Sequence, residues 1–406
     1  MDVFKMAWRN VWRNRRRTLV TVAAMALALL VMILYNGLME GYLLVMERNV
    51  LDLEMGDVQV FAPGYQDKPS IYTRIQDTGA LLARLDRLGY PASGRLIGGG
   101  LAAAGDASAG VTLRGLVVER DAAVSQIYKH VGEGQWLASD RPGEAVLGRR
   151  LARTLGIKPG DELVVLGQAA DGSIANELYT VRGVLKGVSD VTDRSGIFLT
   201  AEAFREFFIL PSGEHQIIVR RPADLDLTTV ASTIRDLAPK LEVKTWRELM
   251  PTIASMMDSM RGVTYTVFFI VYIAIGILIL NAMLMAVFER IREFGVLKAL
   301  GVGPGHVLGL ILTESAFQTG LAILAGLTLS LPGLWYLTRV GINMGTLGGM
   351  SIMGLALDPV WRTVVTPNTF IHPVLILILI VSVAVLYPAL KAAWISPSPL
   401  KAIRHQ

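Results

Sequence analysis

The side chains that perform acid–base, nucleophilic or metal chemistry are few in this sequence and widely separated. The histidines show no metal-ligand spacing, and there is no cysteine to act as a nucleophile or a thiolate ligand. The sequence also lacks the G-x-x-x-x-G-K-[ST] loop that binds nucleotide phosphates and the hydrolase motifs H-E-x-x-H and G-x-S-x-G. We therefore predict that this chain has no catalytic residue, metal ligand or bound cofactor, and that it is not an enzyme. The histidines are His130, His215, His306, His372 and His405.

The charged stretch ERIREFGVLKALGVGPGHV lies between two long apolar runs. Its apolar residues recur every three positions and predict an amphipathic helix with one apolar stripe. Gly301 and Pro304 predict where this helix ends, because glycine can adopt the left-handed cap conformation and proline cannot continue a helix. Such a helix either lies among lipid head groups or fits a groove on a partner protein, and periodicity alone does not distinguish the two. The stripe consists of Ile291, Phe294, Leu297 and Leu300.

The composition is that of an integral membrane protein. Hydrophobic residues make up 52% of the 406 residues, charged residues make up 18%, and the mean hydropathy is +0.47. Four apolar runs are each long enough to cross about 30 Å of hydrocarbon as a helix. We predict four transmembrane helices at residues 18–44, 263–288, 307–337 and 373–390. The third run is so long that we expect it to kink or end near Pro332, or to project beyond the bilayer.

Basic residues lie at the edges of the apolar runs, which indicates membrane orientation rather than nucleic-acid binding, although the net charge is +5. They cluster in residues 1–17, 289–306 and 391–406. With four transmembrane spans, these three segments lie on the same side of the membrane, and the positive-inside rule makes that side cytoplasmic. Residues 45–262 and 338–372 then lie outside, and both termini are cytoplasmic. A cleaved signal peptide is the alternative for residues 1–44, but the apolar run is longer than a signal peptide requires.

Residues 45–262 alternate between strand-like and helix-like patterns and predict a large α+β extracytoplasmic domain, with two lobes expected from its length. GDVQVFAPG, VTLRGLVV, AVLG, DELVVLG, LYTVRGVLKG, GIFLT and HQIIVRR are typical of strands. TGALLARLDRLG, EAVLGRRLARTLG, TAEAFREFFIL and LTTVASTIRDLA are typical of helices. We expect a hairpin turn at Asp171–Gly172, and a loop rather than a phosphate-binding cradle at Gly98–Gly100.

The stretch from Asn281 to Glu314 resembles the permease signature of MacB/FtsX-like ABC transporters. The closing stretch YPALKAAWISPSPLKAIRH and the opening AWRNVWRNRRRT resemble the two ends of the same family, so the resemblance covers nearly the whole chain. The residues of the central signature that match are Asn281, Glu289, Arg290, Arg292, Glu293, Gly295, Leu297, Lys298, Ala299, Gly301 and Glu314.

The resemblance implies that this chain is a permease subunit paired with a second permease chain, identical or paralogous, and with two separate ATPase subunits that bind ATP and Mg. It places the protein in the bacterial inner (cytoplasmic) membrane, with the large domain in the periplasm, where a carrier or adaptor is a further expected partner. It also implies that residues 289–306 form the coupling helix that docks on the ATPase. The docking residues are then Glu289, Arg290, Arg292, Glu293, Phe294, Gly295, Leu297, Lys298, Leu300 and Gly301.

Within this family, GDVQVFAPGY and the absence of an ATPase domain look more like the lipoprotein-releasing LolC/LolE branch. The leading hypothesis is thus extraction or export of a lipoprotein or another amphipathic substrate, driven mechanically by the ATPase. The alternative is an FtsX-like signalling permease that regulates cell-wall hydrolases without transporting a substrate. The candidate substrate-contacting surface consists of Tyr35, Leu38, Met39, Leu43, Met256, Met257, Met260 and Phe268.

Overall fold

The computed structural model describes residues 3–13, 15–343 and 360–394, which form two compact units. The membrane unit is built from the described residues up to Leu43, from Met256 to Asn343 and from Val360 to Trp394. The second unit is an α/β domain from Leu44 to Ser255. The predicted fold class, four membrane helices with a large domain between the first two, is confirmed.

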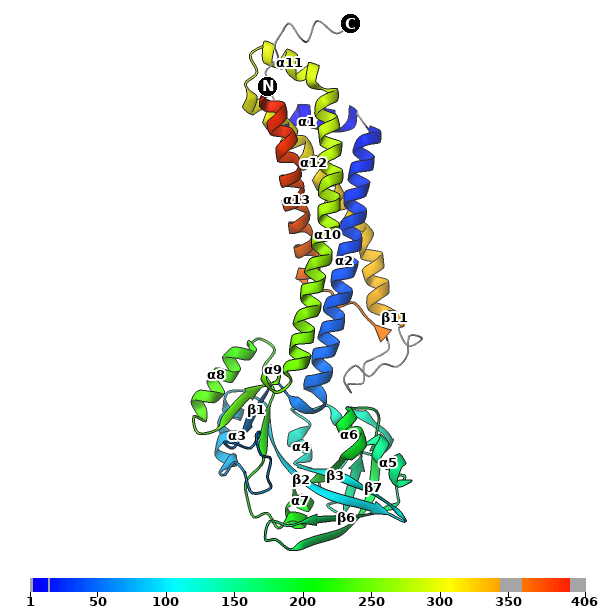
Figure 1. The fold of residues 1–406 in the computed structure, drawn as a ribbon, viewed down its shortest axis with the longest axis vertical. Helices are drawn as coiled ribbons and strands as arrows, with labels where there is room; N and C mark the ends of the chain where they lie inside the picture. Colours follow the sequence, from blue (N-terminus) through cyan, green and yellow to red (C-terminus); the bar gives the residue numbers. More distant parts are fainter. Residues whose placement is uncertain (1–2, 14, 344–359, 395–406) are drawn as a thin grey trace. The chain divides into compact units, whose positions relative to one another are not determined.

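Four helices of the membrane unit are long and apolar enough to cross a bilayer (Figure 1). Each extends beyond the predicted span, because the residues that flank the apolar run continue the helix. The third helix continues through Pro332 and ends at Arg339, so the expected end near Pro332 is not observed. A short π-helical turn, Leu51–Met55, follows the first. The helices are α2 (Arg15–Val50), α10 (Pro251–Glu289), α12 (Pro304–Arg339) and α13 (Pro367–Trp394).

Apolar side chains from all four helices share one core in the membrane unit. A glycine allows α12 to approach α2 closely: a Cβ at Gly326 of α12 would lie 3.1 Å from the backbone oxygen of Ala26 of α2. Small residues permit such helix contacts in lipid. The hydroxyl of Tyr272 on α10 donates a hydrogen bond to the backbone oxygen of Pro373 at 2.8 Å. These contacts connect α2 to α12 and α10 to α13.

Two shorter helices and a strand pair complete the membrane unit. Helix α1 (Val3–Arg13) packs its aromatic side chains on α12, where the ring centres of Trp8 and Phe317 are 5.4 Å apart. Helix α11 (Ile291–Ala299) connects α10 to α12. Strand β11 (Ile342–Asn343) pairs antiparallel with β12 (Val360–Trp361). The rest of the predicted outer loop between them, residues 344–359, and most of the predicted tail, residues 395–406, lie outside the described residues.

A ten-stranded mixed sheet runs through the α/β domain. The strand order is β10-β1-β9-β2-β3-β8-β5-β7-β4, with β6 paired to both β2 and β7. The pairs β3–β8 and β5–β7 are parallel and the other neighbours are antiparallel. The strands are β1 (Val58–Phe61), β2 (Ala92–Ala104), β3 (Ala107–Leu116), β4 (Val131–Gly134), β5 (Glu144–Leu147), β6 (Glu162–Gln168), β7 (Ile174–Leu185), β8 (Gly196–Thr200), β9 (Gln216–Val219) and β10 (Glu242–Thr245).

The helices of the domain cover the sheet and divide its buried side chains into separate clusters. One cluster gathers around α5 and α7 and another around α3 and α8, while β2 contributes residues to both. Side-chain caps start several helices; Thr200, for example, accepts a hydrogen bond from the amide of Ala203. The helices are α3 (Thr78–Arg87), α4 (Val118–Asp121), α5 (Arg149–Leu155), α6 (Asp190–Ser195), α7 (Ala201–Phe208), α8 (Leu227–Leu237) and α9 (Trp246–Leu249), with a 3-10 turn at Ile127–His130.

Two local predictions for this domain are wrong. Gly98–Gly100 is not a loop but lies inside β2, where a Cβ at Gly98 would meet the Phe208 ring at 2.5 Å. Gly98 lets Phe208 of α7 pack directly on the strand, because a glycine in a strand permits close approach. EAVLGRRLARTLG is helical only in its second half, since Glu144–Leu147 forms β5. The hairpin turn at Asp171–Gly172 is confirmed between β6 and β7.

An ion-pair cluster holds the π-helical turn to the sheet. The Nε of Arg221 lies 2.9 Å from Oδ1 of the buried Asp57, and its amide donates to Oδ2 of the same carboxylate at 3.1 Å. Arg220 donates a hydrogen bond to Asp52 within the turn, and Nη2 of Arg221 lies 3.7 Å from Glu47 of α2. The end of α2 and the π-helical turn are thereby joined by ion pairs to the residues that flank β1 and β9.

Candidate functional site

Helix α11 is the charged stretch that stands out in the sequence, and it lies between α10 and α12 (Figure 1). Its first break is Arg290, whose backbone leaves the α-helical region with φ of −104° and ψ of 11°. Its second break is Gly301, whose φ of +89° is a left-handed conformation that glycine adopts without steric cost. Helix α11 is therefore a discrete element between two membrane helices.

Arg290 forms ion pairs with carboxylates from two different helices. Its Nη1 donates to Oε2 of Glu314 on α12 at 2.9 Å, and its Nε donates to Oε2 of Glu293 on α11 at 2.9 Å. The guanidinium carbon also lies 5.3 Å from the ring centre of Phe294. Only 13% of the Arg290 side chain and 14% of the Glu314 side chain are exposed, so either charge alone would be poorly solvated.

Arginines near the N-terminus extend this cluster. Arg13 of α1 donates to Glu293 at 2.6 Å, and Arg17 of α2 donates to Glu289 at the end of α10 at 3.2 Å. Burial by itself would raise the pKa of Glu293, but hydrogen bonds from Arg290 and Arg13 outweigh it and hold the pKa below its usual range. These six side chains, which we call the Arg290 cluster, join α11 to α1 through Arg13 and to α12 through Glu314, while the Arg17–Glu289 pair joins α2 to α10. They are Arg13, Arg17, Glu289, Arg290, Glu293 and Glu314.

Two residues predicted to dock on a partner instead point into the membrane unit. Phe294 is 4% exposed and belongs to the hydrophobic core. The Nζ of Lys298 donates to the backbone oxygens of Ala393 at 2.7 Å and Ala392 at 3.3 Å. These carbonyls lie in the last turn of α13, where helical hydrogen-bond partners are missing. Burial lowers the pKa of Lys298 below its ordinary value. Phe294 and Lys298 thus hold α11 against the bundle.

The exposed side of α11 carries Arg292, Val296 and Leu300. Val296 is 61% exposed and Leu300 is 78% exposed, and the four-residue spacing places all three on one face. The predicted stripe is therefore not a single exposed surface, since Phe294 faces inward, and the side chain of Leu297 lies outside the described residues. Sequence reasoning missed Val296, because we counted apolar residues every three positions instead of every four.

The residues predicted to contact a substrate are only partly accessible. Leu43, Met257 and Phe268 are buried, and the ring centres of Tyr35 and Phe268 are 6.3 Å apart. The structure thus brings Tyr35 of α2 against Phe268 of α10. The partly exposed members of the predicted set are Tyr35, Leu38, Met39, Met256 and Met260.

The α/β domain contains one buried histidine, and its contacts are structural. The Nδ1 of His215 accepts a hydrogen bond from the amide of Ile97 at 3.0 Å, and its Nε2 lies 3.2 Å from the backbone oxygen of Ile71. Burial lowers the pKa of His215 to about 4, so the ring is neutral at pH 7. Across the described ranges 3–13, 15–343 and 360–394, no three His, Cys, Asp or Glu side chains are grouped as metal ligands would be.

Comparison with known families identifies the chain. The MacB-like periplasmic core domain matches residues 18–237, which is more than half of the sequence, and the FtsX-like permease C-terminal region matches residues 265–397. The chain belongs to the MacB/FtsX-like family of ABC transporter permeases. The family predicted from the signature between Asn281 and Glu314 is thereby confirmed.

Individual relatives of this permease are distant. It is 26% identical to an ABC transporter permease of Methanocaldococcus jannaschii over 51% of this chain and 53% of the relative, so it spans about half of that protein's length. It is 22% identical to the lipoprotein-releasing system transmembrane protein LolC of Xylella fastidiosa over 72% of this chain and 73% of LolC. The crystal structure of the periplasmic region of MacB from Actinobacillus actinomycetemcomitans aligns with 49% of this chain and 94% of that region, with a TM-score of 0.38 and 14% identity.

Proposed function

We propose that this permease couples ATP hydrolysis on separate ATPase subunits to the extraction or export of a lipoprotein or another amphipathic substrate from the inner membrane. The observation that carries the proposal is the two-sided character of α11: one side is joined to the bundle through the Arg290 cluster and Lys298, and the other exposes Val296 and Leu300. A helix with these two sides can receive a push on one face and transmit it through the other.

The exposed face of α11 fits the groove of a protein partner better than it fits lipid head groups. Arg292 adds a charge to the apolar pair Val296 and Leu300, and apolar anchors beside a charge are typical of helix-in-groove recognition. In this proposal the partner is the ATPase, which binds ATP and Mg, and two ATPase subunits serve a pair of permease chains. The side that carries α11 and the termini is then cytoplasmic, and the α/β domain is periplasmic.

The substrate in this proposal contacts α2 and α10, where Tyr35, Leu38 and Met39 of α2 are partly exposed. The similarity to LolC, a lipoprotein-releasing system protein, supports a lipid-anchored substrate. The ion pairs of Asp57 and Arg221 then connect movement of α2 to the sheet of the α/β domain. A periplasmic carrier would receive the substrate from that domain.

The docking step is tested with Val296→Asp combined with Leu300→Asp. We expect the ATPase that co-purifies with the tagged permease from its native membrane to fall about tenfold, since burying two carboxylates in an apolar groove is costly. The matched control is Val340→Asp combined with Val365→Asp, two exposed apolar positions in the described chain that lie away from α11. Equal recovery of the ATPase with both double variants would refute docking through this face.

The transport step is tested by photo-crosslinking from Leu38 and Met39. A lipoprotein adduct that disappears when the ATPase hydrolyses ATP would support extraction. Adducts formed only by probes in the α/β domain, with a cell-wall hydrolase or its activator, would instead favour the signalling alternative. Both outcomes are read by mass spectrometry of the crosslinked bands.

A further inference from the structure

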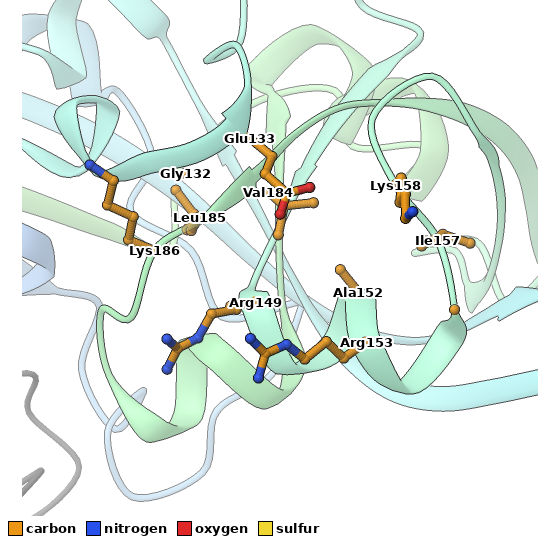
Figure 2. A pocket seen from close by; sticks show the side chains of 11 residues that line it. Gly132, Glu133, Arg149, Ala152, Arg153, Ile157, Lys158, Val184, Leu185 and Lys186 are labelled. Atoms are coloured by element: carbon orange, nitrogen blue, oxygen red, sulfur yellow. The ribbon is translucent and has the colours of Figure 1, made fainter. Parts of the chain in front are cut away.

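A basic cavity of about 490 Å³ opens on the α/β domain between α5, the turn after it, β4 and the end of β7 (Figure 2). Small-molecule sites in proteins usually enclose about 300–1,000 Å³. The proposed transport function does not use this cavity, so a ligand bound in it would serve a separate purpose.

Four cationic side chains and one carboxylate, Glu133, line the cavity. Figure 2 shows the guanidinium groups of two of them, Arg149 and Arg153, next to each other on α5. Like charges four residues apart on a helix repel each other by a few tenths of a kcal/mol, and a bound anion would offset that repulsion. The cations are Arg149, Arg153, Lys158 and Lys186.

Most of this positive charge is not neutralised within the domain. Arg149 has a carboxylate nearby, since its Nη2 lies 3.6 Å from Oδ2 of Asp193. Its Nε, however, is buried and has no hydrogen-bond partner among the described residues. In the described part of the chain, Arg153, Lys158 and Lys186 form no ion pair within 4.0 Å. A buried donor without a partner and three unpaired cations are what an anion site provides.

The base of the cavity is apolar. Val184 is 7% exposed and Leu185 is 1% exposed, and Ala152 and Ile157 lie beside them. Inorganic phosphate alone would leave this surface and most of the volume unused. A ligand that combines an acidic group with a carbon body would contact both the cations and the base.

We propose that this cavity, which we call the α5 cavity, binds a phosphate-bearing small molecule. The two guanidinium groups match the oxygens of a phosphate, which carries up to two negative charges and suits the excess of cations better than a single carboxylate does. The phosphate lies between Arg149 and Arg153, Lys186 contributes a further charge, and the carbon portion covers Val184 and Leu185. The phosphate belongs to a soluble organophosphate or to the head group of a phospholipid.

The test uses the full chain in phosphatidylcholine nanodiscs and measures binding by calorimetry. The probes are inorganic phosphate, glycerol 3-phosphate and a short-chain phosphatidylglycerol. The cavity variant is Arg153→Glu combined with Lys186→Glu, two exposed side chains whose reversal leaves the ion pair of Arg149 and Asp193 intact. The control is Arg84→Glu combined with Lys240→Glu, which makes the same charge change at exposed positions outside the cavity.

We expect glycerol 3-phosphate or the short-chain lipid to bind more tightly than inorganic phosphate. The affinity for that ligand should fall about tenfold or more in the cavity variant but not in the control. Tighter binding of glycerol 3-phosphate identifies a soluble ligand, and tighter binding of the lipid identifies a head group. Binding should also weaken as salt is raised from 50 to 300 mM, ionic strengths across which the Debye length falls below about 10 Å.

The neutral variant Arg153→Gln combined with Lys186→Gln repeats the test without charge reversal, and thermal unfolding checks that each variant is folded. The proposal is overturned if none of the three probes binds to the wild-type chain. It is equally overturned if the cavity variants and the control variant bind the probes with the same affinity.

Discussion

The Nη1 atom of Arg290 lies 2.9 Å from the Oε2 atom of Glu314, and this ion pair joins the start of α11 to the membrane helix that follows it. Both side chains are mostly buried, so the pair is held in a region where water screens charge poorly. Because Glu293 of α11 also pairs with Arg13 of α1, a displacement of α11 would change two ion pairs with other helices at once. The pair therefore joins the start of α11 directly to α12.

Removing one partner of this pair should destabilise the membrane unit. Glu314→Gln leaves the Arg290 charge without its buried partner, which we expect to cost about 3 kcal/mol and to lower the unfolding temperature in detergent. The double substitution Arg290→Met with Glu314→Met should recover most of the loss, because no unpaired charge remains. Asp258→Asn is the control, since Asp258 pairs with Arg261 at an exposed site 3.9 Å away. An effect of Glu314→Gln as small as that of Asp258→Asn would show that the buried pair contributes little.

Lys298 should affect coupling without affecting docking. Lys298→Met removes the donor to the carbonyls of Ala392 and Ala393, so the amides in the last turns of α13 should exchange with deuterium faster. We expect the ATPase still to co-purify, while its stimulation by substrate falls several-fold. Lys298→Arg keeps a donor and should behave like the wild type. Loss of the ATPase from the purified complex would mean instead that Lys298 contributes to the docking face.

The membrane helices and most strands of the domain were predictable because their signals are local. Apolar runs of about 20 residues have few alternatives to a membrane helix, alternation identified the strand Val58–Phe61, and a short apolar run identified Gly196–Thr200. The turn at Asp171–Gly172 was predictable for the same reason, since the residues that form it are adjacent. The bounds were less accurate, because helices such as α10 continue beyond their apolar part.

The sequence was least informative where contacts join residues that are far apart along the chain. Gly98 lies in a strand because Phe208, 110 residues later, packs where a side chain would be. Lys298 points inward because the free carbonyls of Ala392 and Ala393 lie beside it. From the sequence, Arg13 could be interpreted only as a signal of membrane orientation. In the structure it donates a hydrogen bond to Glu293 and so belongs to the Arg290 cluster. The periodicity of apolar residues predicts that a helix has an apolar face, but it does not show which other element that face contacts.

Two glycines of α12 provide a matched test of helix packing in the membrane unit. Gly326→Ala should destabilise it by about 1 kcal/mol or more, because a Cβ there would lie 2.9 Å from Leu29 Cδ2 and 3.1 Å from the backbone oxygen of Ala26. Gly320→Ala meets no atom within 4 Å and should be neutral or slightly stabilising, since alanine favours helix. Thermal unfolding in the same detergent compares them. Equal unfolding temperatures would show that α2 and α12 do not pack closely at Gly326.

The α/β domain should fold without the membrane unit. Residues 45–255 contain the whole ten-stranded sheet and its buried clusters, so a fragment with these ends keeps the core intact. We expect a soluble monomer with a cooperative unfolding transition and dispersed amide resonances. A fragment that aggregates or unfolds without cooperativity would mean that the domain depends on the membrane helices for stability.

The buried His215 should make the stability of this domain depend on pH. Its pKa is lowered to about 4 by burial, with a further contribution from Arg74 and Arg205, whereas an unfolded histidine has a pKa near 6.5. Between these values the unfolded chain binds a proton that the folded domain does not, so stability is highest above pH 6.5 and falls as the pH decreases toward 4. We expect His215 to account for a loss of about 2–3 kcal/mol between pH 7 and pH 4.5. His215→Asn, whose side-chain oxygen can accept from the Ile97 amide, should remove this part of the pH dependence, while His130→Asn should leave it in place. Denaturant unfolding at several pH values measures the difference, and parallel curves for the wild type and His215→Asn would contradict the assignment.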